Sequence, residues 1–294
     1  IPSTANENLQ LNKKPTAQTG VLRVIQAGLG PLDTPQKKLN YLNFYGNLMK
    51  KVDGQIGQLL GVFDAAGGEN MLKNTLIIRT SDHGEMGLSH GLRQKTFVSY
   101  EETIRVPLIW SNPEMFPSPR TSNAMVSHVD LLPTLCSLTG VPNWQSKGFK
   151  GVDYSSLIWD PEALPVQNHV LFTFDDIYAG ADMTRFPNGV ANPPNRIQMI
   201  RSSEFKYARY YDLAGVQPDQ GEFYDLRPDG GDYDPAFKQP LEMNNLSEWA
   251  AANFPNPPLL TAEQTAARAQ LSSDLAAAVA TRLQPRPKNA PQNA

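Results

Sequence analysis

The sequence predicts an α/β fold in its first half, followed by a smaller antiparallel sheet that a final helix covers. Apolar residues recur every three or four positions from Tyr41 to Phe63, which is the pattern of one helix face. The short apolar run Leu76-Ile77-Ile78 ends in the polar residues Ser81-Asp82-His83-Gly84, as strands of α/β folds do where they present chemistry. Arg196–Arg201 and Lys206–Tyr211 are predicted to be two strands around the turn Ser202-Ser203-Glu204, which is typical of a hairpin.

Composition excludes several classes of protein. The chain has 294 residues, 26 basic and 29 acidic side chains, a net charge of −3, and 40% apolar residues. This balance is typical of a folded globular chain and gives no support for nucleic-acid binding. All apolar runs fall short of the roughly 18 residues that suggest a membrane span. The single cysteine, Cys136, excludes an internal disulfide and a cysteine-rich zinc site.

The first half should contain two helices and two short strands. Residues 1–35 are polar and broken by four prolines, so we expect an irregular segment there. The long amphipathic helix follows and ends at Gly67-Gly68. A second strand is predicted at Val106–Trp110, with its proline at the strand start or at a sheet edge. Ser127 can cap the next helix, and Asp130 lies in its first turn.

The second half should be rich in turns. Val170–Phe174 is predicted to be a strand, and the hairpin follows it. Residues 212–260 are dominated by Pro, Gly, Asp and Asn, so we expect a loop. Thr261 and Gln264 form a capping box, which predicts a final helix to about Leu283.

These patterns divide the chain into four parts. The predicted parts are an irregular segment 1–35, an α/β part 36–160, a small α+β part 161–283 and a disordered tail 284–294.

The stretch from Thr80 to Lys95 carries the candidate chemistry. A carboxylate and an imidazole, Asp82 and His83, are adjacent at a strand end, which suits a divalent cation. Lys95 adds a positive charge that can stabilise a sulfate or phosphate oxyanion. The same Asp-His-Gly triplet can also be an ordinary turn in which the aspartate bonds the backbone. From the residues alone, both interpretations stay open.

This pattern resembles the sulfatase family of the alkaline-phosphatase-like superfamily. A strand, Ser-Asp-His-Gly-Glu, a His-Gly-Leu, a lysine thirteen residues after Asp82, and Ile104-Arg105-Val106-Pro107-Leu108 occur in the family's order. The later blocks that continue this order lie at 129–135, 148–157, 222–226 and 242–246. The resemblance extends over residues 36–250. It implies the C-terminal part of an alkaline-phosphatase/sulfatase-like α/β sandwich, plus a small antiparallel sheet with a terminal helix.

The resemblance also implies roles for single residues. Asp82 and His83 match two ligands of the family's single divalent cation. Calcium is the expected ion, and the nitrogen ligand keeps manganese, magnesium and zinc as alternatives. Lys95 matches the lysine that contacts the substrate sulfate near the leaving oxygen. His90 is close in sequence and is a second catalytic candidate.

The rest of the family's site has no counterpart in this sequence. The family's N-terminal half carries paired aspartates and a Cys/Ser-x-Pro-x-Arg motif, whose first residue is oxidised to the formylglycine nucleophile. The sequence around Cys136 lacks both the proline and the arginine, so this cysteine is expected to be a buried small residue. We therefore expect the C-terminal portion of a larger hydrolase, which begins at a processed or cut end and is inactive without the N-terminal half as its partner.

The expected activity of the parent protein is hydrolysis of a small-molecule or carbohydrate sulfate ester. The alternatives are a phosphonate monoester or phosphodiester hydrolase of the same superfamily, and a non-catalytic fragment that keeps the fold. A periplasmic or secreted location is implied by the family alone. Structural roles are preferred for two nearby residues. Arg105 looks close to the pocket by its position, but a salt bridge that fixes the strand is the preferred role, and His128 is expected at a surface or capping position.

Overall fold

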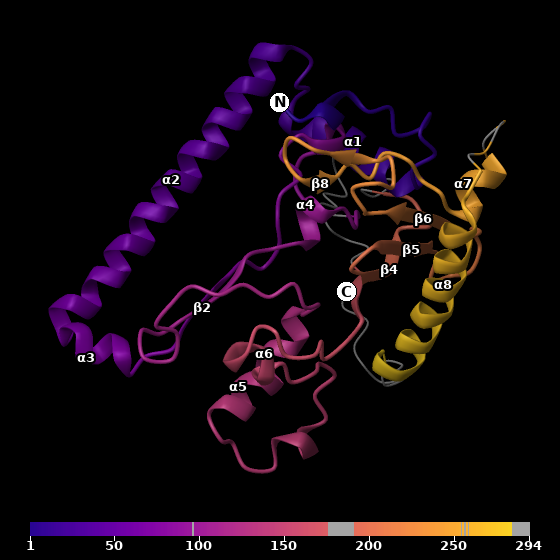
Figure 1. Cartoon of the computed structure of the whole chain (residues 1–294). Helices are drawn as coiled ribbons and strands as arrows, with labels where there is room; N and C mark the ends of the chain where they lie inside the picture. Colours follow the sequence, from indigo (N-terminus) through magenta and orange to yellow (C-terminus); the bar gives the residue numbers. More distant parts are fainter. Residues whose placement is uncertain (96, 176–190, 254, 256, 258, 284–294) are drawn as a thin grey trace.

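The computed structural model describes residues 1–95, 97–175, 191–253, 255, 257 and 259–283 (Figure 1). Its helices are α1 (Thr16–Leu29), α2 (Pro35–Ala66), α3 (Gly68–Lys73), α4 (Glu101–Ile104), α5 (Leu131–Leu138), α6 (Ser155–Trp159), α7 (Glu248–Asn253) and α8 (Ala262–Arg282). Its strands are β1 (Ile77–Thr80), β2 (Leu108–Ser111), β3 (His169–Phe174), β4 (Arg196–Ser202), β5 (Phe205–Tyr211), β6 (Gln220–Asp225), β7 (Tyr233–Asp234) and β8 (Gln239–Pro240). Short 3-10 helices occur at Ser3–Asn6, Ser89–Gly91, His128–Asp130 and Trp144–Lys147. In this described part, no helix is long and apolar enough to cross a membrane.

A four-stranded antiparallel sheet, ordered β3-β4-β5-β6, forms the centre of the second half. Its strands follow one another as a meander, because each pairs with the next along the chain. The predicted strand at Val170–Phe174 and the predicted hairpin are both confirmed.

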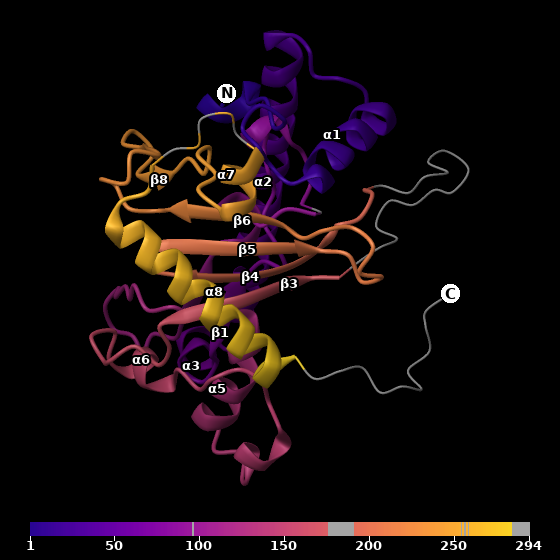
Figure 2. The same cartoon turned by 90° about the vertical axis from the view of Figure 1, so that its right-hand side faces the viewer.

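The final helix α8 covers one face of this sheet (Figure 2). Leu271 and Leu275 pack against the β4 side chain Ile200 and against Phe205 and Phe223 of β5 and β6. The two phenylalanine rings are stacked with centroids 5.7 Å apart. The capping box of Thr261 and Gln264 forms as predicted, and it fixes the start of the helix that packs on the sheet.

The opposite face is covered by α1, which the sequence did not predict. Ala17 and Val21 of α1 pack with Phe97, Met199 and Tyr210. The expectation that residues 1–35 are irregular is therefore wrong. The prolines bound this helix and do not interrupt it, since the residue before its first turn is a proline. Burial of its apolar side chains against the sheet supplies the stabilisation that its sequence pattern did not reveal.

The predicted loop 212–260 is also wrong in part, because it contains β6 and α7. Asn245 holds β6 in place from the side. Its Nδ2 donates to the Gly221 carbonyl at 2.8 Å, and its Oδ1 accepts from the Phe223 backbone N–H at 3.1 Å. The two late sequence blocks, 222–226 and 242–246, are thus a strand and the segment that fastens it.

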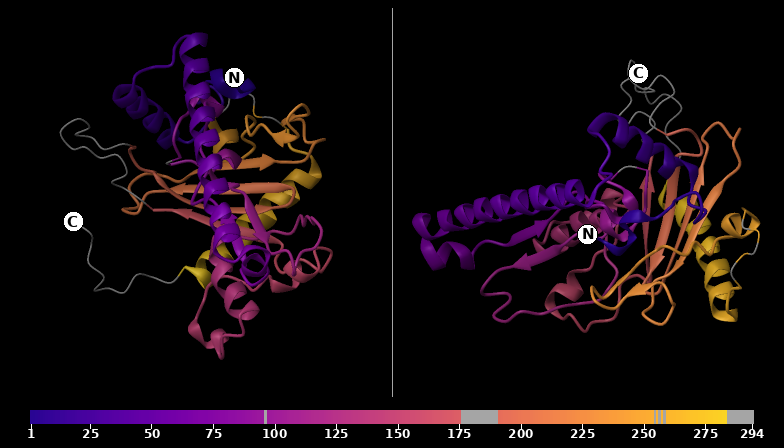
Figure 3. Two further views of the ribbon diagram at one scale, coloured as in Figure 1. Left: turned by 90° about the vertical axis from the view of Figure 1, so that its left-hand side faces the viewer. Right: turned by 90° about the horizontal axis from the view of Figure 1, so that it is seen from above.

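Helix α2 forms as predicted, from the N-cap Thr34 to its end at Gly67. Its apolar face, however, stays uncovered by the described residues: Tyr45 is 37% exposed, Leu48 44%, Val52 46% and Leu59 65%. Figures 1 and 3 show the helix projecting away from the four-stranded sheet. The amphipathic pattern therefore predicted the helix correctly, while its apolar face has almost no packing partner among the described residues.

Strands β1 and β2 form a separate antiparallel ribbon, in which Thr80 pairs with Leu108. The segment that leads into α5 is fixed beside it by the buried carboxylate of Asp130. This carboxylate accepts hydrogen bonds from the backbone N–H groups of Ser127 and Val152, at 2.7 and 2.8 Å, which confirms the predicted helix start. The half-buried Cys136 lies in α5, so its predicted full burial is not observed.

Candidate functional site

The predicted Asp-His pair lies in the turn that follows β1. Asp82 Oδ1 accepts the backbone N–H of His83 at 3.0 Å, and Oδ2 lies 3.2 Å from His83 Nε2. Although desolvation acts in the other direction, hydrogen bonding and charge from His83 keep the pKa of Asp82 below its ordinary value. The carboxylate is therefore ionised at neutral pH and faces solvent.

The imidazole of His83 is oriented for a ligand at Nε2. Its Nδ1 lies 2.8 Å from the Gly84 carbonyl, an acceptor that assigns the proton to Nδ1 and the lone pair to Nε2. The Lys95 ammonium also contacts Nε2. The structure thus brings together Asp82, His83 and Lys95, three of the four residues predicted from the sequence.

Close backbone contact anchors this turn on the segment around α4. The Gly84 N–H donates to the Thr103 carbonyl at 2.9 Å, and the Glu85 N–H donates to the Glu102 carbonyl at 3.0 Å. A Cβ atom at Gly84 would lie 1.9 Å from the Glu102 carbonyl oxygen. Glycine is therefore required here by the approach of two backbones.

Glu85 is a structural residue of the site that the sequence analysis missed. Its Oε1 accepts from the backbone N–H of Gln94 at 2.8 Å and from the Tyr41 hydroxyl at 2.6 Å. The loop between Glu85 and Lys95 is conformationally demanding, because Leu88, His90 and Gln94 all have positive φ angles. Glu85 therefore links α2 to the loop that delivers Lys95. Its position directly after the Asp-His-Gly triplet was the signal that could have identified it.

His90, the second catalytic candidate, is not brought to the other three. It is 1% exposed, contacts the Glu7 carboxylate through Nδ1, and stacks on Tyr100 with ring centroids 3.8 Å apart. Like Lys95, it is not among the residues that line the cavity at Asp82, but unlike Lys95 it makes no contact with His83. This placement gives its predicted catalytic role no support.

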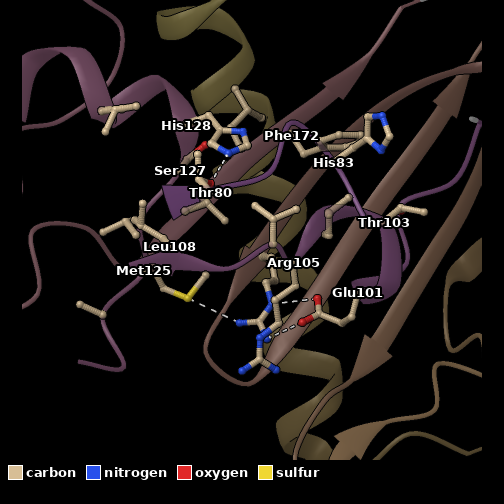
Figure 4. A pocket seen from close by; sticks show the side chains of 18 of the residues that line it. Thr80, His83, Glu101, Thr103, Arg105, Leu108, Met125, Ser127, His128 and Phe172 are labelled. Atoms are coloured by element: carbon tan, nitrogen blue, oxygen red, sulfur yellow. Dashed lines mark hydrogen bonds and ion pairs between the residues drawn. The ribbon is translucent and has the colours of Figure 1, made fainter. Parts of the chain in front are cut away.

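A cavity of about 430 Å³ opens beside the Asp-His turn (Figure 4). The ribbon, the segment before α5, and strands β3 and β4 provide its walls. Its polar lining includes Thr80, Asp82, His83, Glu101, Arg105, His128 and Arg201. Its apolar lining includes Val106, Leu108, Val126, Leu131, Val170, Leu171 and Phe172. A polar end and an apolar wall are typical of a small-molecule site.

Two residues for which structural roles were predicted line this cavity. His128 is exposed as predicted, and its Nε2 lies 3.2 Å from the Thr80 hydroxyl at the end of β1. Arg105 is exposed, and no salt bridge of it is found among the described residues. The predicted strand-fixing ion pair is therefore wrong for this part of the chain, and the guanidinium lies at the cavity instead.

The other arginine of the cavity is fully engaged. Arg201 Nε and one terminal nitrogen each donate to Glu101 at 3.0 Å, a two-pronged pair. Lys206 lies 3.6 Å from the same carboxylate and also contacts Glu242. Despite burial, Lys206 and Arg201 hold the pKa of Glu101 below its ordinary value. Glu101 therefore stays ionised.

The pKa of Glu242 is shifted in the opposite direction. Burial raises its pKa from 4.5 to about 8, because desolvation and the neighbouring carboxylate of Glu101 outweigh the attraction of Lys206. Folded Glu242 therefore binds a proton that the unfolded chain releases between these two values.

We expect the free energy of unfolding to fall as pH rises from about 5 to about 8, and Glu242→Gln to reduce this slope. The folded state binds more protons than the unfolded state in this window, so raising the pH favours unfolding. Urea unfolding at a series of pH values measures the slope. The exposed Glu204→Gln is the control, and an unchanged slope in Glu242→Gln would contradict the assignment.

The donor set at the turn fits two positions of a metal site. A carboxylate oxygen and the unprotonated Nε2 of an imidazole, whose Nδ1 is held by a carbonyl, are an ordinary pair of metal ligands. No cluster of three or more His, Cys, Asp or Glu side chains with suitable geometry occurs in the described part of the chain. Divalent cations take about four to eight ligands, so further ligands must come from elsewhere.

Comparison with known families agrees with this fold. The family described as sulfatase matches residues 3–141, and the family described as N-sulphoglucosamine sulphohydrolase, C-terminal, matches residues 88–251. The chain belongs to the sulfatase family, as its motifs predicted. The family generally implies a metal ion. Solved sulfatases share the fold, so the predicted fold class is confirmed.

Individual relatives give the extent of the similarity. An N-acetylglucosamine-6-O-sulfatase of Bacteroides thetaiotaomicron is 30% identical over 71% of this chain and 32% of its own length. A structure solved in complex with its substrate, D-glucosamine-2-N,6-O-disulfate, matches with a TM-score of 0.62 and 23% identity, over 95% of this chain and 50% of that one. A phosphonate monoester hydrolase of Agrobacterium radiobacter matches with a TM-score of 0.54 and 26% identity, over 80% and 40%. The chain spans about a third of the length of the curated relatives it matches.

Proposed function

We propose that this chain supplies the Asp-His-Lys portion of a sulfuric ester hydrolase that cleaves sulfate esters of sugars. The observation that carries the proposal is the meeting of Asp82, His83 and Lys95 at one turn, in a chain of the sulfatase family. Lys95 reaches this turn across a loop of positive-φ residues, which is a costly arrangement for a surface lysine.

The proposed metal ligands are the Asp82 carboxylate and His83 Nε2, and calcium is the proposed ion. Manganese, magnesium and zinc are the alternatives, because imidazole suits the softer ions better than calcium. When bound, the ion would polarise the oxygens of the sulfate group. The Gly84 carbonyl keeps the His83 ring in the required orientation.

The Lys95 ammonium is proposed to stabilise the negative charge that develops on the bridging oxygen as the ester bond breaks. Because it is half-buried beside His83, its charge acts at short range and is less screened by water. The nucleophile is proposed to be a formylglycine in the part of a sulfatase that this sequence does not contain. That N-terminal part is also the proposed partner of the exposed apolar face of α2, since burial of such side chains drives association.

A sulfated amino sugar is the proposed substrate class. The support is the 30% identity to an N-acetylglucosamine-6-O-sulfatase and the fold shared with a protein solved with a sulfated glucosamine. The apolar wall of the cavity suits the carbon face of a sugar ring.

In a protein that joins this chain to the nucleophile-bearing part, we expect Lys95→Ala to lower kcat for glucosamine-6-sulfate by about 100-fold. The control is Lys37→Ala, because Lys37 forms only an exposed pair with Asp33. Sulfate release by ion chromatography measures the rate. A phosphonate monoester hydrolysed faster than the sulfate ester would favour the alternative activity. A Lys95→Ala variant with the wild-type rate would rule out the proposed role of this lysine.

A further inference from the structure

We propose that Arg105 forms a second anion-binding site in the cavity, which takes a carboxylate or a second sulfate group of the substrate sugar. This proposal rests on the function proposed above, in which the reactive sulfate lies at Asp82, His83 and Lys95. It adds the specificity of the site: a sugar that carries two anionic groups.

The position of Arg105 relative to the Asp-His turn follows from the backbone pairing. Thr80 pairs with Leu108 in the ribbon, and the Gly84 N–H bonds the Thr103 carbonyl just beyond it. Arg105 lies between these two contacts, on the segment that faces Asp82 and His83. Figure 4 shows Arg105 and His83 on the same cavity, and both belong to its lining.

Arg105 forms no ion pair among the described residues, and its charge acts on the Glu101 carboxylate only from a distance. The nearby carboxylate of Glu101 has both oxygens occupied by the Arg201 fork, and Lys206 lies behind it at 3.6 Å. The other carboxylate in the lining is Asp82, which the proposed metal engages. This wall of the cavity therefore carries an excess of positive charge.

The chemistry of the side chain selects the ligand. A guanidinium presents a planar fork of N–H donors, which matches the oxygens of a carboxylate or a sulfate. The apolar residues Val106, Leu171 and Phe172 line the same cavity. The volume of about 430 Å³ has room for one sugar ring with its substituents.

The test compares two substrates in the protein that joins this chain to the nucleophile-bearing part. One substrate is glucosamine-6-sulfate, and the other is D-glucosamine-2-N,6-O-disulfate. We expect Arg105→Gln to raise KM for the disulfate by about tenfold or more and to leave kcat and the KM for the monosulfate within about twofold. Arg105→Lys should fall between wild type and Arg105→Gln, because an ammonium keeps the charge and loses the fork. Arg209→Gln is the control, since Arg209, which lies on β5, forms an exposed ion pair with Asp219.

Calorimetric binding of the disulfate gives a second readout that does not need turnover, and Arg105→Gln should weaken it by about tenfold. Equal losses for both substrates, or no loss for either, would overturn the proposal for Arg105. Absence of hydrolysis of both substrates by the wild type would overturn the proposed function. In that case, binding of the disulfate that Arg105→Gln does not weaken would overturn the second site as well.

Discussion

Replacement of Lys206 by methionine is expected to lower the free energy of unfolding by about 3–5 kcal/mol. Lys206 is 1% exposed, donates to the Ser99 carbonyl at 2.7 Å, and contacts Glu242. Methionine keeps much of the volume but removes one partner of the ionised Glu101 and leaves the Ser99 carbonyl without its donor. A buried charge or polar group that loses its partner is costly.

Arg209→Met on the same strand is the matched control. Its partner Asp219 is exposed, and exposed ion pairs contribute about 0–1 kcal/mol. Urea unfolding followed by circular dichroism measures both variants. Equal losses in the two variants would show that the buried ion cluster does not stabilise the fold.

The second large effect is expected for Gly84→Ala, with a loss of about 3 kcal/mol or more. The new methyl group would lie 1.9 Å from the Glu102 carbonyl oxygen, so the turn or the α4 segment must move. Because the proposed metal ligands Asp82 and His83 belong to this turn, the metal affinity of the protein that joins this chain to the nucleophile-bearing part should fall together with stability. Thermal unfolding of the chain and calcium titration of the joined protein by calorimetry measure the two losses.

Gly57→Ala in α2 is the control that distinguishes the loss of this backbone contact from a general effect of replacing glycine with alanine. A Cβ atom at Gly57 meets nothing within 4 Å, and alanine favours the helix by about 0.5–1 kcal/mol. Gly57→Ala should therefore be neutral or stabilising. A Gly84→Ala variant as stable as the wild type would contradict the close approach of the two backbones.

Local signals predicted the parts of the fold that depend on local chemistry. The capping boxes at Ser127 and Thr261 and the glycine end of α2 could be recognised within a few residues. Helix α1 and strand β6 could not, because long-range contacts stabilise both. Gln18 of α1 donates to Glu222 of β6 at 2.9 Å, and no periodicity in either segment encodes that bond.

In the candidate site, too, local signals predicted some residues, and long-range contacts placed the others. Adjacency and charge singled out Asp82, His83 and Lys95, and the resemblance to the sulfatase family implied their roles; all three lie in one turn and its loop. The same proximity in sequence was misleading for His90, whose backbone φ of 56° accompanies its packing into the core against Tyr100. The position of Arg105 in the sequence suggested a place near the pocket, but a strand-fixing salt bridge was preferred, and the tertiary structure places it at the cavity.

The bond between Tyr41 and Glu85 has a mechanical consequence. Helix α2 has 32 residues, so at 1.5 Å per residue it is a rod of about 48 Å. Tyr41 lies in its second turn, and farther along the helix Asp53 forms an exposed ion pair with Arg79 of β1. The Glu85 carboxylate that accepts from Tyr41 also accepts from the backbone N–H of Gln94, the neighbour of Lys95. A shift of α2 at Tyr41 would therefore reach the lysine through two hydrogen bonds.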